Sequence, residues 1–485
     1  MACGNILRDL YEGLIAEDAA GRPIPGMAER WETSADGLRW TFHLRAGLRW
    51  SDGQPLDAEQ IVASFRRALD PATGAPMAMQ FAAIDNAIAI LRGERDPGAL
   101  GVHAPDARTV EFRLIRPAPL ESLLTLPLAY PVWLTGIAAH GDRHTRAGHL
   151  VSNGAYRLHA WTPQSSLRLR ANPHYHAAVA IDEVGYHVTE DAAAERKRFE
   201  AGDLHVTETA PPGRQAELRR RFGDALRIEP YLGSFWLGLN LTRPPFADNR
   251  ALREALSLAV DRDILTRAIT GMDESPAWGI VPPGIGSYRN PSPPHADWTQ
   301  AQRDALARQR YAEAGYSRGR PLRVELRYNS SLPHRRTLLA VSAMWRETLG
   351  VHSELRNEEW KVFVQNRRQR VLTQVFRGGW IADVADPLDF LGGFDGDTAL
   401  NWTGYHNPAF SAVLREAREA ADPATRMRLA AEAERLLLDD HAVIALYHYT
   451  SKHLVDPRLD GWIGNPLDRH PSRFLRWRDV ESSPD

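Results

Sequence analysis

One segment of the sequence, residues 377–383, combines residue types that could bind a charged ligand. It reads RGGWIAD and follows a strand-like run at residues 373–376. The two glycines would let the backbone of a ligand come close to the chain. The Asp383 carboxylate could pair with an ammonium group, and the Arg377 guanidinium could pair with a carboxylate. Taken alone, the segment is explained at least as well by a structural salt bridge.

Histidine is the other residue type that could bring chemistry to this chain, which has 18 of them. His140, His144 and His149 are close in sequence, and imidazole is a ligand for zinc, copper and nickel. The glycines beside them indicate a loop, and no carboxylate is placed to orient their ring nitrogens. We therefore predict no metal site and no cofactor. A second group flanks a predicted buried strand and is interpreted as structural: His441, His448 and His453.

Catalytic motifs are missing from the sequence. There is no phosphate-binding loop, no dinucleotide-binding glycine motif, no serine elbow and no zinc-protease helix, so we predict no catalytic residues. The formal net charge of -2 provides no positive field for a nucleic-acid partner. The one cysteine, Cys3, excludes an internal disulfide and a multi-cysteine metal cluster.

The elements that would position these residues are irregularly mixed helices and strands. Alternating or buried patterns predict strands at 38–44, 109–114, 322–328 and 442–449, and apolar faces predict helices at 5–16, 58–68, 334–349 and 424–438. Asp57 is a candidate N-cap for the second of these helices. The mixture indicates an α+β or multi-domain α/β fold, and a length of 485 residues suggests about three domains.

Several sequence blocks carry a resemblance to a known family. They read NILRDLYEGL at 5–14, PGMAERW at 25–31, WTFHLR at 40–45, WSDGQP at 50–55, NGAY at 153–156, AVDRDI at 259–264 and AEAGY at 312–316. With the RGGWIAD segment, they resemble the family 5 extracellular solute-binding proteins, the bacterial periplasmic oligopeptide-binding proteins of ABC importers. The blocks occur in the order and spacing of that family.

The resemblance implies an architecture and a mode of action. The family fold is a two-lobed periplasmic binding protein fold, with α/β lobes, a hinge between them and an additional domain. It encloses a peptide between the lobes by hinge closure. On this chain, the first lobe would take residues 1–11, 151–232 and 459–485, the additional domain 12–150, and the second lobe 233–458.

The resemblance also implies roles for charged residues. Asp383 matches the aspartate that pairs with the α-ammonium of the peptide, and Arg377 matches an arginine that receives the carboxylate of short peptides. Arg367 and His334 match two further basic positions that meet the carboxylates of longer peptides, partly through water. This charged set favours oligopeptides over the family's other ligands, which are dipeptides, murein peptides, nickel complexes and haem.

Other positions of the implied site are aromatic or lie on the strand backbone. Trp360 matches a tryptophan that lines a side-chain pocket. Gly379, Trp380 and Ile381 lie on the strand that should pair with the peptide. The resemblance places the two cysteines of a family disulfide at Gly233 and Ile381, so both partners of that bond are absent here.

The resemblance finally implies a partner and a location. We expect a monomer in the periplasm that delivers an oligopeptide to an ABC permease in the inner membrane. Relatives carry an export signal and about thirty mature residues before the block at residue 5, which form the leading strand of the first lobe. Because the sequence begins without them, we expect a mis-assigned start or, as the alternative, a truncated, cytosolic or chaperone-like paralogue that does not transport.

Overall fold

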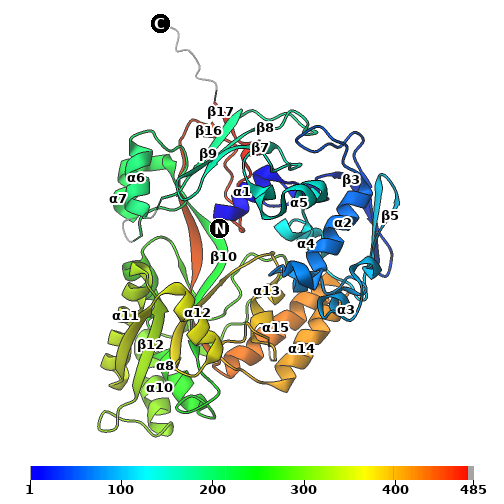
Figure 1. The fold of residues 1–485 in the computed structure, drawn as a ribbon. Helices are drawn as coiled ribbons and strands as arrows, with labels where there is room; N and C mark the ends of the chain where they lie inside the picture. Colours follow the sequence, from blue (N-terminus) through cyan, green and yellow to red (C-terminus); the bar gives the residue numbers. More distant parts are fainter. Residues whose placement is uncertain (1, 190, 213–214, 397, 479–485) are drawn as a thin grey trace. The chain divides into compact units, whose positions relative to one another are not determined.

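The computed structural model describes residues 2–189, 191–212, 215–396 and 398–478 (Figure 1). The chain forms two compact units, which we describe separately. The N-terminal unit comprises residues 1–209 and 453–485, and the central unit comprises residues 210–452. The predicted separation of an additional domain at residues 12–150 stays a prediction. Among the described residues, no helix is long and apolar enough to cross a membrane.

The central unit is built on a six-stranded mixed sheet. Its strand order is β11-β15-β10-β14-β12-β13, with bounds Ser275–Pro276, Val443–Leu454, Leu226–Leu239, Val375–Ile381, Arg323–Asn329 and His352–Glu358. β14 runs antiparallel to β10 and parallel to β12. Alternate residues of β12 are buried (Val324, Leu326 and Tyr328), which is the period expected of a strand with one face in the core.

Helices surround this sheet. Their bounds are α8 Arg250–Leu258, α10 Gln300–Glu313, α11 Leu332–Leu349, α12 Trp360–Gln369, α13 Pro387–Leu391, α14 Pro408–Glu419 and α15 Pro423–Asp439. Ser331 caps the N-terminus of α11, and Gly350 ends it in the left-handed conformation, with φ of 79°. The fully buried Trp345 of α11 packs into the main core with Leu256 and Leu446. The helices thereby hold the edge of β12 and the start of α12 in place.

The two larger sheets of the N-terminal unit are antiparallel. The first has the order β3-β4-β6-β5, with bounds Ala28–Thr33, Arg39–Leu44, Thr109–Arg113 and Val102–Asp106. The second has the order β7-β8-β9, with bounds Tyr156–Thr162, Ser166–Ala171 and Glu183–His187. Helix α2, Ala58–Leu69, packs on the first sheet and starts with a capping box between Asp57 and Gln60.

Most of the predicted elements are present, but the helix predicted at 5–16 is correct only as far as residue 10. Helix α1 covers Ala2–Leu10 only, and Ile15–Glu17 form strand β1, which pairs with β2, Pro23–Pro25. A Cβ at Gly13 would lie 2.7 Å from the backbone oxygen of Leu124, so the chain here makes a close backbone contact in place of a helical turn. Tertiary contacts therefore override the apolar helical pattern.

Candidate functional site

The site begins with a strand that has one open edge. Along one edge, β14 pairs with β10 from Val375 to Ile381. Along the other edge, β12 pairs with β14 only at Val375 and Phe376. From Arg377 onward, no strand in the described part of the chain pairs with this edge. Such an edge presents unpaired backbone N–H and C=O groups that another extended chain can use.

Two glycines in this strand have a packing role that the sequence does not reveal. A Cβ at Gly378 would lie 2.3 Å from the Trp236 ring, so only glycine fits beside that indole. A Cβ at Gly379 would lie 3.0 Å from the Ser234 carbonyl oxygen and 3.2 Å from the Tyr449 hydroxyl. The glycines let β14 lie against β10 and its aromatic side chains, which is a different reason from the ligand approach that the sequence suggested.

Arg377 is a partly buried cation next to the open edge. Its guanidinium carbon lies 5.5 Å from the centroid of the Phe235 ring, and its side chain hydrogen-bonds to Tyr449. Its Nε atom is buried and has no hydrogen-bond partner. Within the described residues, no carboxylate forms an ion pair with Arg377.

Arg367, in α12, is buried more deeply, with only 5% of its surface exposed. Its guanidinium carbon lies 3.3 Å from the centroid of the Trp402 ring, and its Nε is buried without a hydrogen-bond partner. Burial, together with the positive charges of Arg377 and Arg368, lowers the pKa of Arg367 to about 9. No ion pair with a carboxylate offsets this cost in the part of the chain that the structure describes. Such a cation would be stabilised by a bound anion.

His334 lies in the first turn of α11, close enough to Arg377 to be affected by its charge. Its Nδ1 atom is 3.1 Å from Asn329 Oδ1, and its ring centroid is 5.6 Å from that of Phe235. Burial and the charge of Arg377 lower the pKa of His334 to about 3. At neutral pH the ring is therefore an uncharged hydrogen-bonding group, whereas the sequence suggested a basic one.

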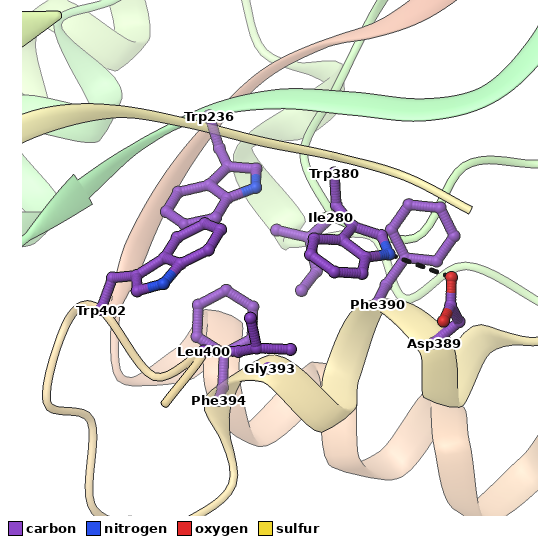
Figure 2. A pocket seen from close by; sticks show the side chains of 9 residues that line it. All are labelled: Trp236, Ile280, Trp380, Asp389, Phe390, Gly393, Phe394, Leu400 and Trp402. Atoms are coloured by element: carbon purple, nitrogen blue, oxygen red, sulfur yellow. Dashed lines mark hydrogen bonds between the residues drawn. The ribbon is translucent and has the colours of Figure 1, made fainter. Parts of the chain in front are cut away.

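Two carboxylates mark the other end of the strand. The backbone N–H of Asp383 donates to Asp389 Oδ2 at 2.8 Å. The indole N–H of Trp380 donates to the same oxygen at 3.0 Å (Figure 2). Burial and the negative charge of Asp383 raise the pKa of Asp389 to about 7. The sequence analysis did not single out Asp389. A signal for it was present, because Asp386 and Pro387 begin a helix and Asp389 lies in its first turn.

An aromatic pocket lies beside these carboxylates (Figure 2). The space between its lining residues is about 340 Å³ when the adjoining open solvent is included, and these residues are Trp236, Ile280, Trp380, Asp389, Phe390, Gly393, Phe394, Leu400 and Trp402. Trp236 and Trp402 stack with their ring centroids 6.0 Å apart. Only Trp380 of this set was predicted as a site residue. Trp360, which was also predicted, is half exposed at the start of α12 and does not line this pocket.

The pairing register of β10 and β14 places Gly233 and Ile381 opposite each other. Gly233 of β10 is the direct cross-strand partner of Ile381 of β14. A Cβ at Gly233 would lie 3.2 Å from Ile381 Cγ1. These are the positions that the family resemblance assigned to a disulfide, and directly opposed residues have the spacing that such a bond requires.

Comparison with known proteins identifies the family. The model of the bacterial extracellular solute-binding proteins, family 5 (Middle) matches residues 22–402. The chain belongs to this family. The chain is 35% identical to the periplasmic oligopeptide-binding protein OppA of Escherichia coli, over 97% of this chain and 88% of that protein.

Two solved structures show the same architecture. The Escherichia coli murein tripeptide-binding protein MppA matches with a TM-score of 0.89 and 32% identity, over 99% of this chain and 94% of that one. Haemophilus influenzae OppA, solved in complex with RPPGFSPFR, matches with a TM-score of 0.85 and 30% identity, over 98% and 94%. The predicted fold class, a mixed α/β, two-lobed periplasmic binding protein fold, is confirmed by these matches.

Proposed function

We propose that this protein is the solute-binding receptor of a peptide ABC importer and that its ligands are oligopeptides with free termini. The observation that carries the proposal is the pair of cations Arg367 and Arg377, which lack a carboxylate partner among the described residues, beside the open edge of β14. The relatives named for oligopeptide and murein tripeptide binding support it.

In this proposal, the ligand is held at both ends. Its α-ammonium pairs with Asp383, next to the second carboxylate of Asp389, and its carboxylate lies near Arg377 or Arg367, with His334 as a neutral hydrogen-bonding neighbour. An extended strand rises about 3.3 Å per residue, so the four steps from Arg377 to Ile381 cover about 13 Å, close to the length of a tetrapeptide. The length of this open edge therefore suits tri- to pentapeptides.

Backbone pairing would make the binding tolerant of peptide sequence. The ligand adds to β14 along Gly379, Trp380 and Ile381, and these hydrogen bonds do not depend on its side chains. The aromatic pocket beside Trp380 accepts one apolar side chain near the ammonium end. Trp360, half exposed, offers a second apolar surface toward longer ligands.

We also propose the setting in which this receptor acts. It works as a monomer in the periplasm, binds its ligand without chemical conversion, and passes it to an ABC permease in the inner membrane. The location is supported by the relative that is named as a periplasmic oligopeptide-binding protein.

Isothermal titration calorimetry with four ligands tests the proposal. We expect a tetrapeptide with free termini to bind, and its N-acetylated and C-amidated forms to bind at least about tenfold more weakly, because each loses a charge-assisted bond. The murein tripeptide is the fourth ligand. Equal affinity for the free and N-acetylated tetrapeptides would overturn the ammonium site, and binding of the murein tripeptide alone would replace the oligopeptide assignment with a murein one.

A further inference from the structure

A second cluster of polar side chains, in the N-terminal unit, is independent of the peptide site. His453 Nε2 lies 2.9 Å from Asp468 Oδ1, and His470 Nε2 lies 3.1 Å from the same oxygen. The three candidate ligand atoms all lie within 4.8 Å of one another. His453 and His470 are only 6% and 8% exposed. Three donor atoms from two separate segments therefore converge in a largely buried place.

The orientation of both rings is set by neighbouring groups. His453 Nδ1 lies 2.8 Å from the carbonyl oxygen of Thr207, so Nδ1 carries a proton and donates to it. This leaves Nε2 as the atom that faces Asp468. A backbone carbonyl in this position is the usual partner of a metal-ligating histidine, because it fixes the tautomer. His470 stacks on Trp462, with ring centroids 3.7 Å apart and an interplanar angle of 16°.

The backbone segment that carries the Asp468 carboxylate is also fixed by hydrogen bonds. Asp468 has a left-handed backbone, with φ of 54°, and its N–H donates to the Asn465 carbonyl at 3.0 Å. The Asn465 side chain donates to the Arg469 carbonyl at 2.8 Å and accepts from the Arg469 N–H at 3.1 Å. These hydrogen bonds fix the backbone of the segment 465–469, which carries Asp468 and leads directly into His470.

We propose that His453, Asp468 and His470 bind one divalent transition-metal ion, with Zn²⁺ as the best match. Two imidazole nitrogens and one carboxylate oxygen form a ligand set that zinc accepts at about 2.0–2.2 Å, with a fourth position for water. The ion would replace two protons, one on each histidine Nε2 that faces Asp468, and both protons would be released to solvent. It would clamp the end of β15 to the segment 465–470 and so stabilise the N-terminal unit.

The sequence prediction of no metal site considered only histidines that are close in sequence. In the structure, the pair His140 and His149 does stack, with ring centroids 4.1 Å apart, but no carboxylate oxygen joins it in a candidate ligand set of the described residues. His453 and His470 are separated by sixteen intervening residues and meet only through the fold. The partly buried pair therefore provides a matched control for the buried one.

Zinc retention tests the site. The protein, purified without a histidine tag, is stripped with a chelator, loaded with Zn²⁺, dialysed and analysed for metal. We expect about one retained equivalent and a melting temperature raised by several degrees. His453→Gln and His470→Gln should each retain less than about one tenth of an equivalent, whereas a double variant, His140→Gln with His149→Gln, should retain as much as the wild type.

Two outcomes would overturn the assignment. One is a wild-type protein that retains no zinc after dialysis, and the other is retention that survives both His453→Gln and His470→Gln. Because a variant of a buried residue can fail to fold, Co²⁺ loading of the wild type gives a second measurement. Intense visible absorption bands of a four-coordinate cobalt ion would support the site, and a weak six-coordinate spectrum would overturn it.

Discussion

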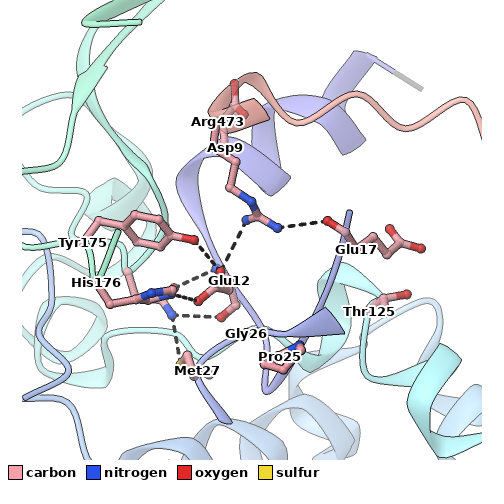
Figure 3. Close-up of polar contacts among 12 residues, drawn as sticks. Asp9, Glu12, Glu17, Pro25, Gly26, Met27, Thr125, Tyr175, His176 and Arg473 are labelled. Carbon is pink, nitrogen blue, oxygen red and sulfur yellow. Dashed lines mark hydrogen bonds and ion pairs between the residues drawn. The ribbon is translucent and has the colours of Figure 1, made fainter. Parts of the chain in front are cut away.

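Two clusters of arginine and carboxylate side chains in this molecule differ in how their charges are matched. In the N-terminal unit, Arg473 contacts Glu12 at 3.4 Å, and Arg469 and Arg8 both pair with Glu17 (Figure 3 shows the part around Arg473). All of these side chains are at most 10% exposed. Each of these buried cations therefore has a buried anion beside it.

Glu12 shows how complete this matching is. It accepts hydrogen bonds from Tyr175 and His176, at 2.5 and 2.6 Å, in addition to its contact with Arg473 (Figure 3). Burial would raise the pKa of Glu12, but the bonds and charges of these partners hold it below its ordinary value. The carboxylate is thus stabilised as an anion and belongs to the folded framework.

Among the described residues, Arg367 and Arg377 of the central unit lack this matching, unlike Arg327 and Arg426 of the same unit, which pair with carboxylates. Arg367 is as buried as the arginines of the first cluster, yet its guanidinium lies over the Trp402 ring and is exposed to the like charges of Arg377 and Arg368. An uncompensated buried charge destabilises a protein, so its presence calls for a function. The comparison separates carboxylate-matched charges, which stabilise the fold, from the two unmatched charges, which we propose serve a ligand.

The largest effect should come from breaking a matched pair. Replacing Glu12 with alanine leaves Arg473 buried without its anion, and we expect a loss of about 3–5 kcal/mol in the free energy of unfolding. Urea denaturation followed by circular dichroism measures it. Glu32→Ala is the control, since the exposed Glu32–Arg30 pair should contribute less than about 1 kcal/mol. Equal effects of the two substitutions would remove the distinction between the clusters.

The second-largest effect should be on tetrapeptide affinity and not on the free energy of unfolding. Asp383→Asn preserves the shape of the side chain but removes the charge that we propose pairs with the peptide ammonium. We expect tetrapeptide affinity to fall about a hundredfold, which corresponds to about 2.7 kcal/mol. Calorimetry measures this, with Asp439→Asn as a control because that carboxylate is exposed and pairs with Arg435. An affinity unchanged by Asp383→Asn would show that the ammonium binds elsewhere.

Replacing arginines with methionine compares the unmatched cations of the central unit directly with a matched cation of the N-terminal unit. Arg367→Met and Arg377→Met each remove a cation that has no carboxylate partner among the described residues, so we expect the free energy of unfolding to stay the same or rise. Tetrapeptide affinity should nevertheless fall about thirtyfold for at least one of them. Arg473→Met is the control and should destabilise the fold. The comparison fails if Arg367→Met and Arg377→Met destabilise the protein as much as this control does.

The smallest effect concerns pH. Asp389 has a pKa of about 7 in the free protein, and a bound ammonium favours its ionised form and lowers that pKa. Binding therefore releases a proton near neutral pH, and affinity should decline up to about tenfold between pH 8 and pH 6. Calorimetry in two buffers of different ionisation enthalpy measures the proton release. Asp389→Asn should flatten the profile, and an equally steep profile in that variant would assign the effect to another group.

The sequence by itself determined the family, many local elements and the identity of the main charged residues. Asp57 begins a helix with a capping box, and the alternation of apolar residues at 322–328 matches strand β12. Arg377 and Asp383 could be singled out because charge, glycine content and strand pattern are local properties of the chain. The aligned blocks then placed the whole chain in one family.

Only the tertiary structure decided the state of those residues. Burial next to Arg377 makes His334 neutral, burial next to Asp383 raises the pKa of Asp389, and the end of the β12–β14 pairing leaves one edge of β14 open. The fold also brings His453 to His470. Protonation, charge matching and ligand geometry depend on desolvation and on neighbours that are distant in sequence, and no local pattern of residues records them.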